Sequence, residues 1–575
     1  MKKLKYKVIS IGALALLTIN SCTRDFNEYN SQYSQGLGDE QLKADFVLLV
    51  SPFKEMQRNL AHPTSWIYQL QTNLNADMYS GLFSTATPYN GGRNNTTYFM
   101  MDGWNERIMQ EQIEDIFGQT KNFKSKAKEI YPEANFSHSL AILNVLKVIA
   151  AQKVSDAHGP IIYSKFETPN PDGSTDFDSQ QQAYMSFVND LSQSIQVLQT
   201  AIATEDKSVI TKSDLIFGGD VQKWAKLANS MKLRIAMRMS YADAANSRKY
   251  AEEALSSPVG FIDSNDSNAL VKYGGAHPIN NIIYSWGDCK IGAPLMAYMN
   301  GFKDPRISRY ARPATDDAVK NQYIGVRQGV DLGGSTDRYG KFSLPIAAAA
   351  SGDYFSGSDG KNKIFSAAEI WFLKAEAAIR GYAGAGDAKT NYEKGIQTSF
   401  EEWGKGAGYS TYIADGTSTE APYIDPKTPS NSITPGSPML STITIKWNDG
   451  DNFEKKLERI ITQKWIALYP DGPEAWAEQR RTGYPIIFQV VNNDSQGAIS
   501  TTAFIRRVPI PNKYRNNNPI GYQKAVATLG GLTQEAPNCG GTRNKLLIGS
   551  INLDTPFLFH PCKSGFQTKT KSPLS

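Results

Sequence analysis

The segment 179–203 carries its apolar side chains on one face and glutamine, serine and aspartate on the other. Apolar residues that recur three or four positions apart form one stripe along an α-helix, so this segment is predicted to be a helix packed against a core. The same periodicity occurs at 136–154, 220–241, 367–380, 388–403 and 452–469. The pattern constrains the chain to a mainly α fold. The stripe in 179–203 consists of Tyr184, Phe187, Val188, Leu191, Ile195, Leu198 and Ile202.

Two of these segments, 367–380 and 388–403, follow each other across a short connection. Gly381 is predicted to end the first helix, as glycine commonly does just past a helix. The connection also contains Gly384 and Gly386, and because it follows a helix rather than a strand, these glycines indicate a turn and not a nucleotide-binding loop. Neighbouring helix pairs are typical of stacked helical hairpins. We therefore predict a tetratricopeptide-like scaffold, although no strict consensus repeat is present.

Long segments rich in Gly, Asn, Ser, Thr, Asp and Pro separate the helices. They carry tyrosine, phenylalanine and tryptophan throughout, which argues against disorder. Long loops positioned by a rigid scaffold tend to form binding surfaces. No linker divides the chain, so residues 22–575 are predicted to form a single domain, a helical scaffold with long aromatic-rich loops and minor β-structure. The loop segments are 80–105, 256–290, 303–362, 405–450 and 490–550.

Residues 1–21 have the organisation of an export signal. Lysines precede an apolar core, Val8 to Ile19, which is too short to span a bilayer. Cys22 follows, and the segment resembles the lipobox of bacterial lipoproteins, in which the cysteine becomes the lipidated first residue. The alternative is a plain signal peptide with an incidental cysteine. Asp25 and Glu28 resemble the acidic tether that sends such lipoproteins to the outer face of the outer membrane.

Composition and motifs exclude several classes of function. Removal of the four signal lysines lowers the formal charge from +5 to +1, and no cluster of lysine and arginine is interleaved with aromatic residues, so nucleic acid is not expected as a partner. The five histidines are scattered and offer no metal site. Signatures of serine hydrolases, zinc proteases and phosphate-binding loops are absent. We assign no catalytic residue, metal or cofactor.

Two chemical questions stay open at this point. The mature chain keeps three cysteines, which allow at most one disulfide, with Cys539 and Cys562 nearer to each other than to Cys289. Paired carboxylates for glycoside hydrolysis leave no sequence signature when folding brings them together. An exported glycoside hydrolase on a helical scaffold is therefore the rival hypothesis from another class.

Six segments together resemble the SusD/RagB family of nutrient-binding outer-membrane lipoproteins. They include "SDAHGPIIYSK" (155–165), "GDVQKWAKLANSMKLRIAMRMS" (219–240) and "RIITQKWIALYPDGPEAWAEQRRTGYP" (459–485), with "FKDPR" (302–306), "AEIWFLKAEAAIRG" (368–381) and "RRVPIPNKYRNNNP" (506–519). The resemblance runs from the segment after Cys22 to about Gln523. The tail 524–575 departs from the family, whose members commonly finish soon after the Asn-rich segment.

The resemblance implies a non-catalytic, surface-exposed lipoprotein that captures an oligosaccharide or polysaccharide. It also implies a partner, a SusC-like TonB-dependent outer-membrane transporter over which the protein closes as a lid. A peptide-binding member of the same family is the alternative within the class. A purely structural helical adaptor, which would bind no small ligand, leaves the aromatic-rich loops without a purpose.

A sugar site needs exposed rings for stacking and polar side chains for the hydroxyl groups. Residues 73–107 supply both types, and the resemblance places part of the ligand surface in roughly this segment. The first candidates are Tyr79, Tyr89, Arg93, Asn94 and Trp104, of which Tyr89, Arg93 and Asn94, near two glycines, are expected to be exposed. For Tyr79 and Trp104 the alternative is packing against the first helices.

Two later segments add candidates of the same kind. "NNIIYSWGDCK" contributes Tyr284 and Trp286, with Asp288 beside them, and "SGDYFSG" contributes Tyr354 and Phe355. Each cluster is a separate hypothesis at this stage.

Other conspicuous residues are predicted to be structural. Trp224 follows the apolar spacing of its helix and is expected in the core. Glu376 and Arg380, four residues apart on one helix, are positioned to pair. The arginines of "QRR" at 479–481 are expected to tie the last helices to neighbouring carboxylates.

Overall fold

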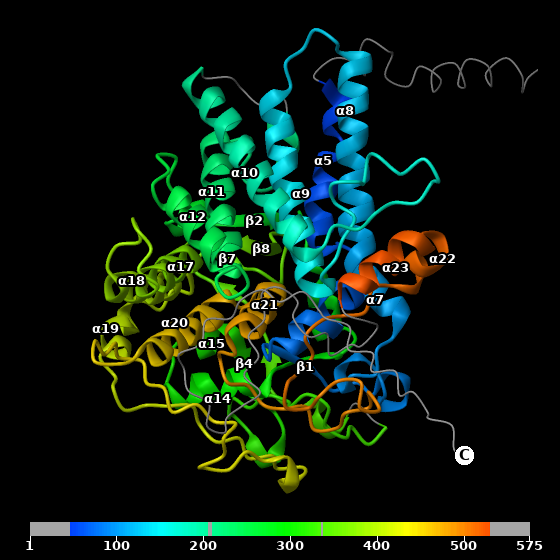
Figure 1. Ribbon diagram of the computed structural model, residues 1–575. Helices are drawn as coiled ribbons and strands as arrows, with labels where there is room; N and C mark the ends of the chain where they lie inside the picture. Colours follow the sequence, from blue (N-terminus) through cyan, green and yellow to red (C-terminus); the bar gives the residue numbers. More distant parts are fainter. Residues whose placement is uncertain (1–45, 205–209, 335–336, 530–575) are drawn as a thin grey trace, which may run out of the picture.

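The computed structural model describes residues 46–204, 210–334 and 337–529. Long helices stand side by side in the upper half of Figure 1, further helices cross the middle, and loop-rich segments fill the lower half. The upper layer begins with α4 (Val47–Val50), α5 (Phe53–Arg58) and η2 (Asn59–Ala61). It continues through one long helical run, α7 (Asp102–Met109), the π-helical η6 (Gln110–Phe117) and α8 (Gly118–Ile130).

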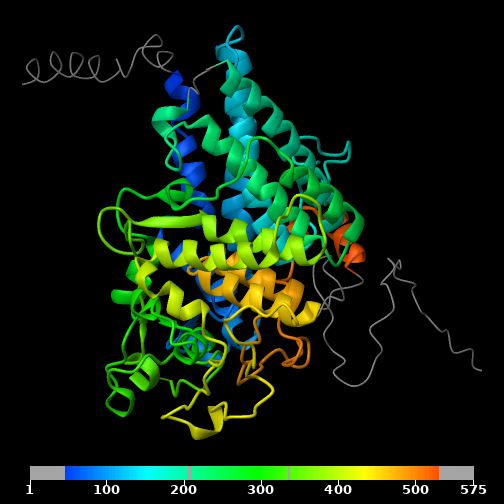
Figure 2. The ribbon, with the colours of Figure 1, turned by 90° about the vertical axis from the view of Figure 1, so that its left-hand side faces the viewer.

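The predicted periodic segments form the scaffold. In the upper layer α10 (Gln180–Ala203) packs between α9 (Ser137–His158) and α11 (Val221–Arg238), and α11 packs on α12 (Ala244–Leu255). In the middle layer α17 (Ala367–Ile379) packs on α18 (Ala388–Glu402) and α20 (Phe453–Leu468), and α20 packs on α21 (Gly472–Thr482). These successive antiparallel pairs confirm the mainly α, tetratricopeptide-like fold, as Figure 2 shows from the side.

Local sequence explains where these helices begin and end. Ser179 caps α10 and forms a reciprocal capping box with Gln182. Gly381 follows α17 with a φ of +69°, which confirms it as the glycine that ends the helix. The stripe of α10 and the nearly all-round apolar α9 then meet in one core, in which Trp224 is fully buried as predicted.

The loops contain short helices and two-stranded antiparallel ribbons, which confirms the minor β-structure. The pairs are β1 (Phe83–Thr85) with β3 (Cys289–Ile291), β2 (Ala269–Lys272) with β8 (Lys361–Phe365), β4 (Ala311–Arg312) with β5 (Leu344–Pro345), and β6 (Ala348–Ala349) with β7 (Gly352–Asp353).

The remaining helical elements lie in or beside the loops. They are α6 (Ser65–Tyr68), the π-helical η3 (Gln69–Asp77), α13 (Pro278–Tyr284), α14 (Ala293–Gly301), α15 (Ile307–Tyr310), α16 (Asp337–Gly340), α19 (Tyr409–Ile413), α22 (Asn512–Asn517) and α23 (Pro519–Thr528). Short 3₁₀ turns are η4 (Tyr89–Gly92), η5 (Asn95–Thr97), η7 (Thr211–Ser213), η8 (Asn265–Ser267), η9 (Asp317–Val319), η10 (Gly406–Gly408) and η11 (Pro429–Asn431).

A buried network of charges joins the scaffold helices. Arg481 of α21 forms two hydrogen bonds with Glu376 of α17, each 2.6 Å long, and two more with Glu478. Glu376 also pairs with Arg380 at 2.9 Å. The predicted pairing of Glu376 with Arg380 is confirmed. Arg481 also contacts neighbouring carboxylates, as predicted for the arginines at 479–481. Arg480 donates to the backbone oxygens of Asp156 and Arg506.

Some sequence predictions lie outside the described residues. They concern Cys22 and the signal 1–21, the pairing of Cys539 with Cys562, and the tail from residue 530 onward.

Candidate functional site

The ribbon β1–β3 brings together two segments that are about 200 residues apart in sequence, in the lower half of the molecule below α7 and α21 (Figure 1). Thr85 faces Cys289 in the register. The hydroxyl of Thr85 donates to the backbone oxygen of Asp288 over 2.7 Å, and the hydroxyl of Thr87 donates to its carboxylate over 2.6 Å. The loop that carries Tyr89 and the segment that carries Trp286 therefore belong to one surface.

Aromatic rings from several segments lie on this surface. Tyr89 contacts Trp104 edge to face, with ring centroids 5.7 Å apart. On the same face of α7, one turn further on, the Arg107 guanidinium lies 4.9 Å from the ring centroid of Trp66. Trp66 is 47% exposed and Trp286 is 41% exposed. We call Trp66, Arg107, Trp104, Tyr89 and Trp286 the aromatic strip.

Gln69 links the loop of Tyr89 to the segment that carries Trp286 and Asp288. Its side-chain nitrogen donates to the hydroxyl of Tyr89 over 2.7 Å and to the carboxylate of Asp288 over 3.1 Å, and the amide itself is buried. Burial and the nearby negative charge of Asp288 raise the pKa of Tyr89. Tyr89 therefore keeps its hydroxyl proton and can donate a hydrogen bond.

We expect Gln69→Leu to lower the free energy of unfolding by about 1–3 kcal/mol, because the Tyr89 hydroxyl and the Asp288 carboxylate both lose a buried donor. Urea denaturation would measure the change. Gln193→Leu, on the exposed face of α10, is the matched control and should change stability by less than about 0.5 kcal/mol. Equal stability of the two variants would contradict the role of Gln69.

A cavity of about 360 Å³ opens on the other side of the Tyr89 loop. Its walls come from residues 84–97, 329–334 and 492–494. Arg93 lines it, is 52% exposed and lies 4.0 Å from the carboxylate of Asp494. Gly91 and Gly92 also line it with positive φ angles, and no atom lies within 4 Å of the position of a Cβ on either. The cavity thus combines exposed backbone with charged and amide side chains.

Four of the candidate ligand residues are buried. Asn94 was expected to be exposed, but it is 1% exposed, because its side chain caps η5 and donates to the backbone oxygen of Tyr89. Tyr79 packs against Trp476, with ring centroids 5.1 Å apart. Tyr354 donates to Glu402 inside the core, and Phe355 is buried beside it. In this conformation the three aromatic rings pack in the core and do not reach solvent.

The other predicted residues lie at or near the surface. Tyr89, Trp104 and Tyr284 are half-buried, and Arg93 and Trp286 are exposed. The Arg312 guanidinium lies 5.0 Å from the ring centroid of Tyr284, whose hydroxyl donates to the backbone oxygen of Pro345. The fold therefore brings the first and second clusters together, whereas the rings of the third are buried in the core.

Comparison with known proteins identifies the family. The family model described as "SusD-like: Susd and RagB outer membrane lipoprotein" matches residues 28–543. The chain belongs to the SusD-like family. This confirms the resemblance that the six sequence segments indicated.

Solved structures of SusD homologues share the fold. A chitin-binding SusD homolog from Flavobacterium johnsoniae is 34% identical, with a TM-score of 0.78 over 86% of this chain and 98% of that one. A SusD homolog from Bacteroides vulgatus is 33% identical, with a TM-score of 0.76 over 87% and 97%. One from Bacteroides uniformis is 30% identical, with a TM-score of 0.77 over 86% and 99%. None of the curated proteins compared matches this chain.

Sequence reasoning missed three residues of the candidate site in this SusD-like chain, Trp66, Gln69 and Arg107. Trp66 and Gln69 lie in the helical segment α6–η3, ahead of the loop-rich stretch from which candidates were taken. Their helical position made them resemble scaffold residues. Only the packing of α6–η3 against α7 and the segment before β3 shows that Trp66 is exposed and that the buried Gln69 bonds both Tyr89 and Asp288.

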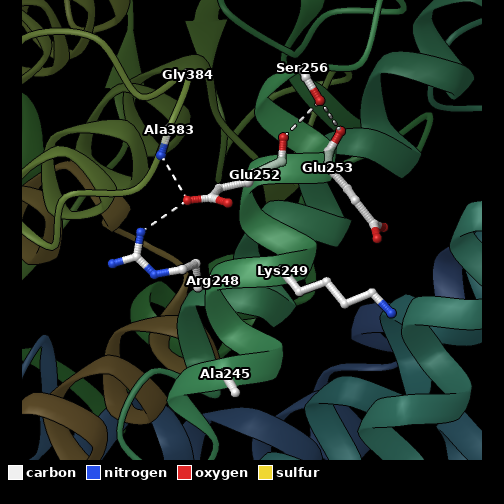
Figure 3. Close-up of a pocket in the computed structure, with 8 residues that line it drawn as sticks. All are labelled: Ala245, Arg248, Lys249, Glu252, Glu253, Ser256, Ala383 and Gly384. Atoms are coloured by element: carbon white, nitrogen blue, oxygen red, sulfur yellow. Dashed lines mark hydrogen bonds and ion pairs between the residues drawn. The ribbon is translucent and has the colours of Figure 1, made fainter.

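A second hollow, of about 600 Å³, lies where α12 meets the turn after α17 (Figure 3). Arg248 donates to Glu252 over 3.0 Å, and the backbone nitrogen of Ala383 donates to the same carboxylate. None of its lining residues is aromatic. The hollow lies between scaffold elements. Gly384, which the sequence placed in a turn between two helices, is one of its lining residues.

Within the ranges 46–204, 210–334 and 337–529, no three His, Cys, Asp or Glu side chains are grouped so that they could hold a metal ion. Over the same ranges, no helix combines the length and apolar character needed to cross a membrane.

Proposed function

We propose that this SusD-like protein is a surface lipoprotein that captures a glycan without cleaving it and passes it to a TonB-dependent outer-membrane transporter. Cys22 is the proposed point of lipid attachment. Membership of an outer-membrane lipoprotein family supports the location, and the chitin-binding relative at 34% identity supports a glycan ligand. The aromatic strip is the observation that carries the proposal.

The strip offers the chemistry that a sugar chain requires. The rings of Trp66 and Trp286 present apolar faces to solvent, against which the C–H faces of sugar rings stack. The polar groups of the neighbouring cavity, Arg93 among them, supply hydrogen bonds for sugar hydroxyls. We include Arg93, Trp104 and Tyr284 in the proposed ligand surface.

Chitin oligosaccharides are the first ligands to test, because one relative is a chitin-binding protein. The purified chain, residues 23–575, should retain such oligosaccharides or another glycan in affinity electrophoresis and calorimetry. Binding of peptides from a protein digest, with no glycan binding, would contradict the glycan assignment. Asp331 and Asp494 are the two carboxylates that line the cavity. Release of reducing ends that disappears on their replacement would contradict the non-catalytic assignment.

We expect Trp66→Ala and Trp286→Ala each to weaken glycan binding at least ~5-fold, about 1 kcal/mol, because each removes an exposed stacking face. Trp371→Ala is the matched control. Trp371 is a half-buried tryptophan on α17, remote from the strip, and its ring nitrogen donates to the backbone oxygen of Asp263. Calorimetric titration of the three variants measures the effect, with circular dichroism as the check on folding. Unchanged affinity in both strip variants would exclude the strip.

A further inference from the structure

The loop between the aromatic strip and the cavity contains an Asn-Gly pair, Asn90–Gly91. Both residues are exposed, and both have left-handed backbone angles, with φ of +50° and +65°. No heavy atom lies within 4 Å of the position that a Cβ on Gly91 would occupy. The peptide between them is therefore sterically open, and the turn around it is closed by hydrogen bonds between Asn90 and Arg93.

We propose that Asn90–Gly91 is a site of spontaneous deamidation, with water as the only co-reactant. The backbone nitrogen of Gly91 loses its proton to solvent hydroxide and attacks the side-chain carbonyl carbon of Asn90. A carbon–nitrogen bond forms, the side-chain carbon–nitrogen bond breaks, and ammonia leaves. Water then opens the cyclic imide at either carbonyl, which gives aspartate or isoaspartate. No oxidation state changes.

The described chain contains a second Asn-Gly pair that serves as an internal reference. Asn300–Gly301 ends α14, and the side chain of Asn300 donates to the backbone oxygen of Tyr323 over 2.7 Å. A Cβ on Gly301 would lie 2.1 Å from the backbone oxygen of Thr419 and 2.4 Å from the backbone nitrogen of Ala421. This peptide is held by helix and by neighbouring backbone, so it cannot rotate to form the imide.

Deamidation at Asn90 alters the ligand loop directly. The Asn90 amide nitrogen donates to the backbone oxygen of Arg93 over 2.7 Å, and this bond closes the turn between Tyr89 and Arg93. A carboxylate has no proton to donate there, so the turn loses the bond and gains a negative charge at the cavity rim. Isoaspartate also lengthens the backbone by one carbon. The expected effect on glycan affinity rests on the proposed function, whereas the deamidation reaction itself does not depend on that function.

Peptide mapping by mass spectrometry after incubation of the purified chain, residues 23–575, in mildly alkaline buffer tests the proposal. The peptide that contains Asn90 should gain the deamidation mass at least ~10-fold faster than the peptide that contains Asn300, a barrier difference of about 1.4 kcal/mol. Asn90→Gln, which would need a larger ring, and Gly91→Ala should both suppress the change. Equal rates at the two asparagines, or an unmodified Asn90, would overturn the proposal.

The ligand arm uses the same samples. Asn90→Asp and the aged protein should bind the glycan more weakly than fresh protein, and aged Asn90→Gln should not lose affinity. If no glycan binds any sample, the proposed function fails while the mass measurement still decides the deamidation. If the mass changes but affinity is the same, the loop modification stands and the link to ligand binding is overturned.

Discussion

Arg481→Met is expected to lower the free energy of unfolding by about 3–5 kcal/mol, because it leaves two buried carboxylates without their shared cation. The Arg481 side chain has no solvent exposure, and its guanidinium contacts Glu376, Glu478 and the hydroxyl of Ser240. Methionine fills a similar volume, so the expected loss of stability comes from the unpaired carboxylates and not from a cavity.

The pKa values of the partners show how strongly the network is balanced. Burial alone would raise the pKa of Glu376, but Arg481 and Arg380 hold it below its ordinary value. Burial would also raise the pKa of Glu478. The positive charges of Arg481, Lys464 and Arg238 outweigh burial and hold this pKa well below its usual range. Removal of Arg481 removes the largest opposing charge from both groups.

Urea denaturation at neutral pH would measure the loss. Arg248→Met is the matched control, because Arg248 pairs with Glu252 on the surface with its side chain 49% exposed, and it should cost less than about 1 kcal/mol. A second variant, Arg481→Met with Glu376→Gln, should recover part of the stability, since one of the stranded charges is gone. A loss in Arg481→Met no greater than that of the control would contradict the account of the network.

Glu420→Gln is expected to stabilise the protein at neutral pH by roughly 3 kcal/mol. Glu420 lies in the long loop before α20, is 5% exposed and accepts a hydrogen bond from the backbone nitrogen of Ser441. The hydroxyl of Ser441 donates to the carboxylate of Glu458 on the other side. Burial, together with the charge of Glu458, raises the pKa of Glu420 to about 9, although Ser441 and Tyr298 oppose this by hydrogen bonding.

The pH dependence follows from proton binding. The unfolded chain releases the Glu420 proton near pH 4.5, whereas the folded chain keeps it to about pH 9. Between these values the unfolded state binds fewer protons, so the stability of the wild type falls as pH rises and levels off above the folded pKa. Glutamine keeps the acceptor for Ser441 and removes the titration, so the advantage of the variant should grow across this window.

Thermal or urea denaturation of wild type and Glu420→Gln at a series of pH values would test this. Glu401→Gln, an exposed carboxylate on α18, is the control and should leave stability within about 0.5 kcal/mol at every pH. A stability difference between wild type and Glu420→Gln that is constant from acid to alkaline pH would contradict a titrating Glu420.

The scaffold was predictable because its signals are local. The stripe of α10, the capping serine before it and the glycine after α17 act within a few residues of where they occur. Helix bounds from periodicity agree with the structure to within a few residues, as for 452–469 and α20. The family resemblance was predictable for a related reason, since its segments are largely the scaffold helices themselves.

The candidate site was predictable only in part. Composition identified segments with rings and amides, but it could not distinguish Tyr79, which packs on Trp476, from Tyr89, which reaches the surface. It also passed over Trp66, because a tryptophan in a short helix gives no local sign of exposure. Exposure of a ring depends on which distant segment covers it, and that information is not local.

The sequence by itself therefore determined the helical scaffold, the helix ends, the family and the loop segments that carry aromatic and amide groups. The tertiary structure alone decided that β1 pairs with β3, that Gln69 bonds both Tyr89 and Asp288, and that Trp66 and Trp286 stay exposed. The physical reason is range. Helix formation and capping depend on neighbours within a few residues, whereas a binding surface depends on contacts between segments some 200 residues apart, which only the packed chain defines.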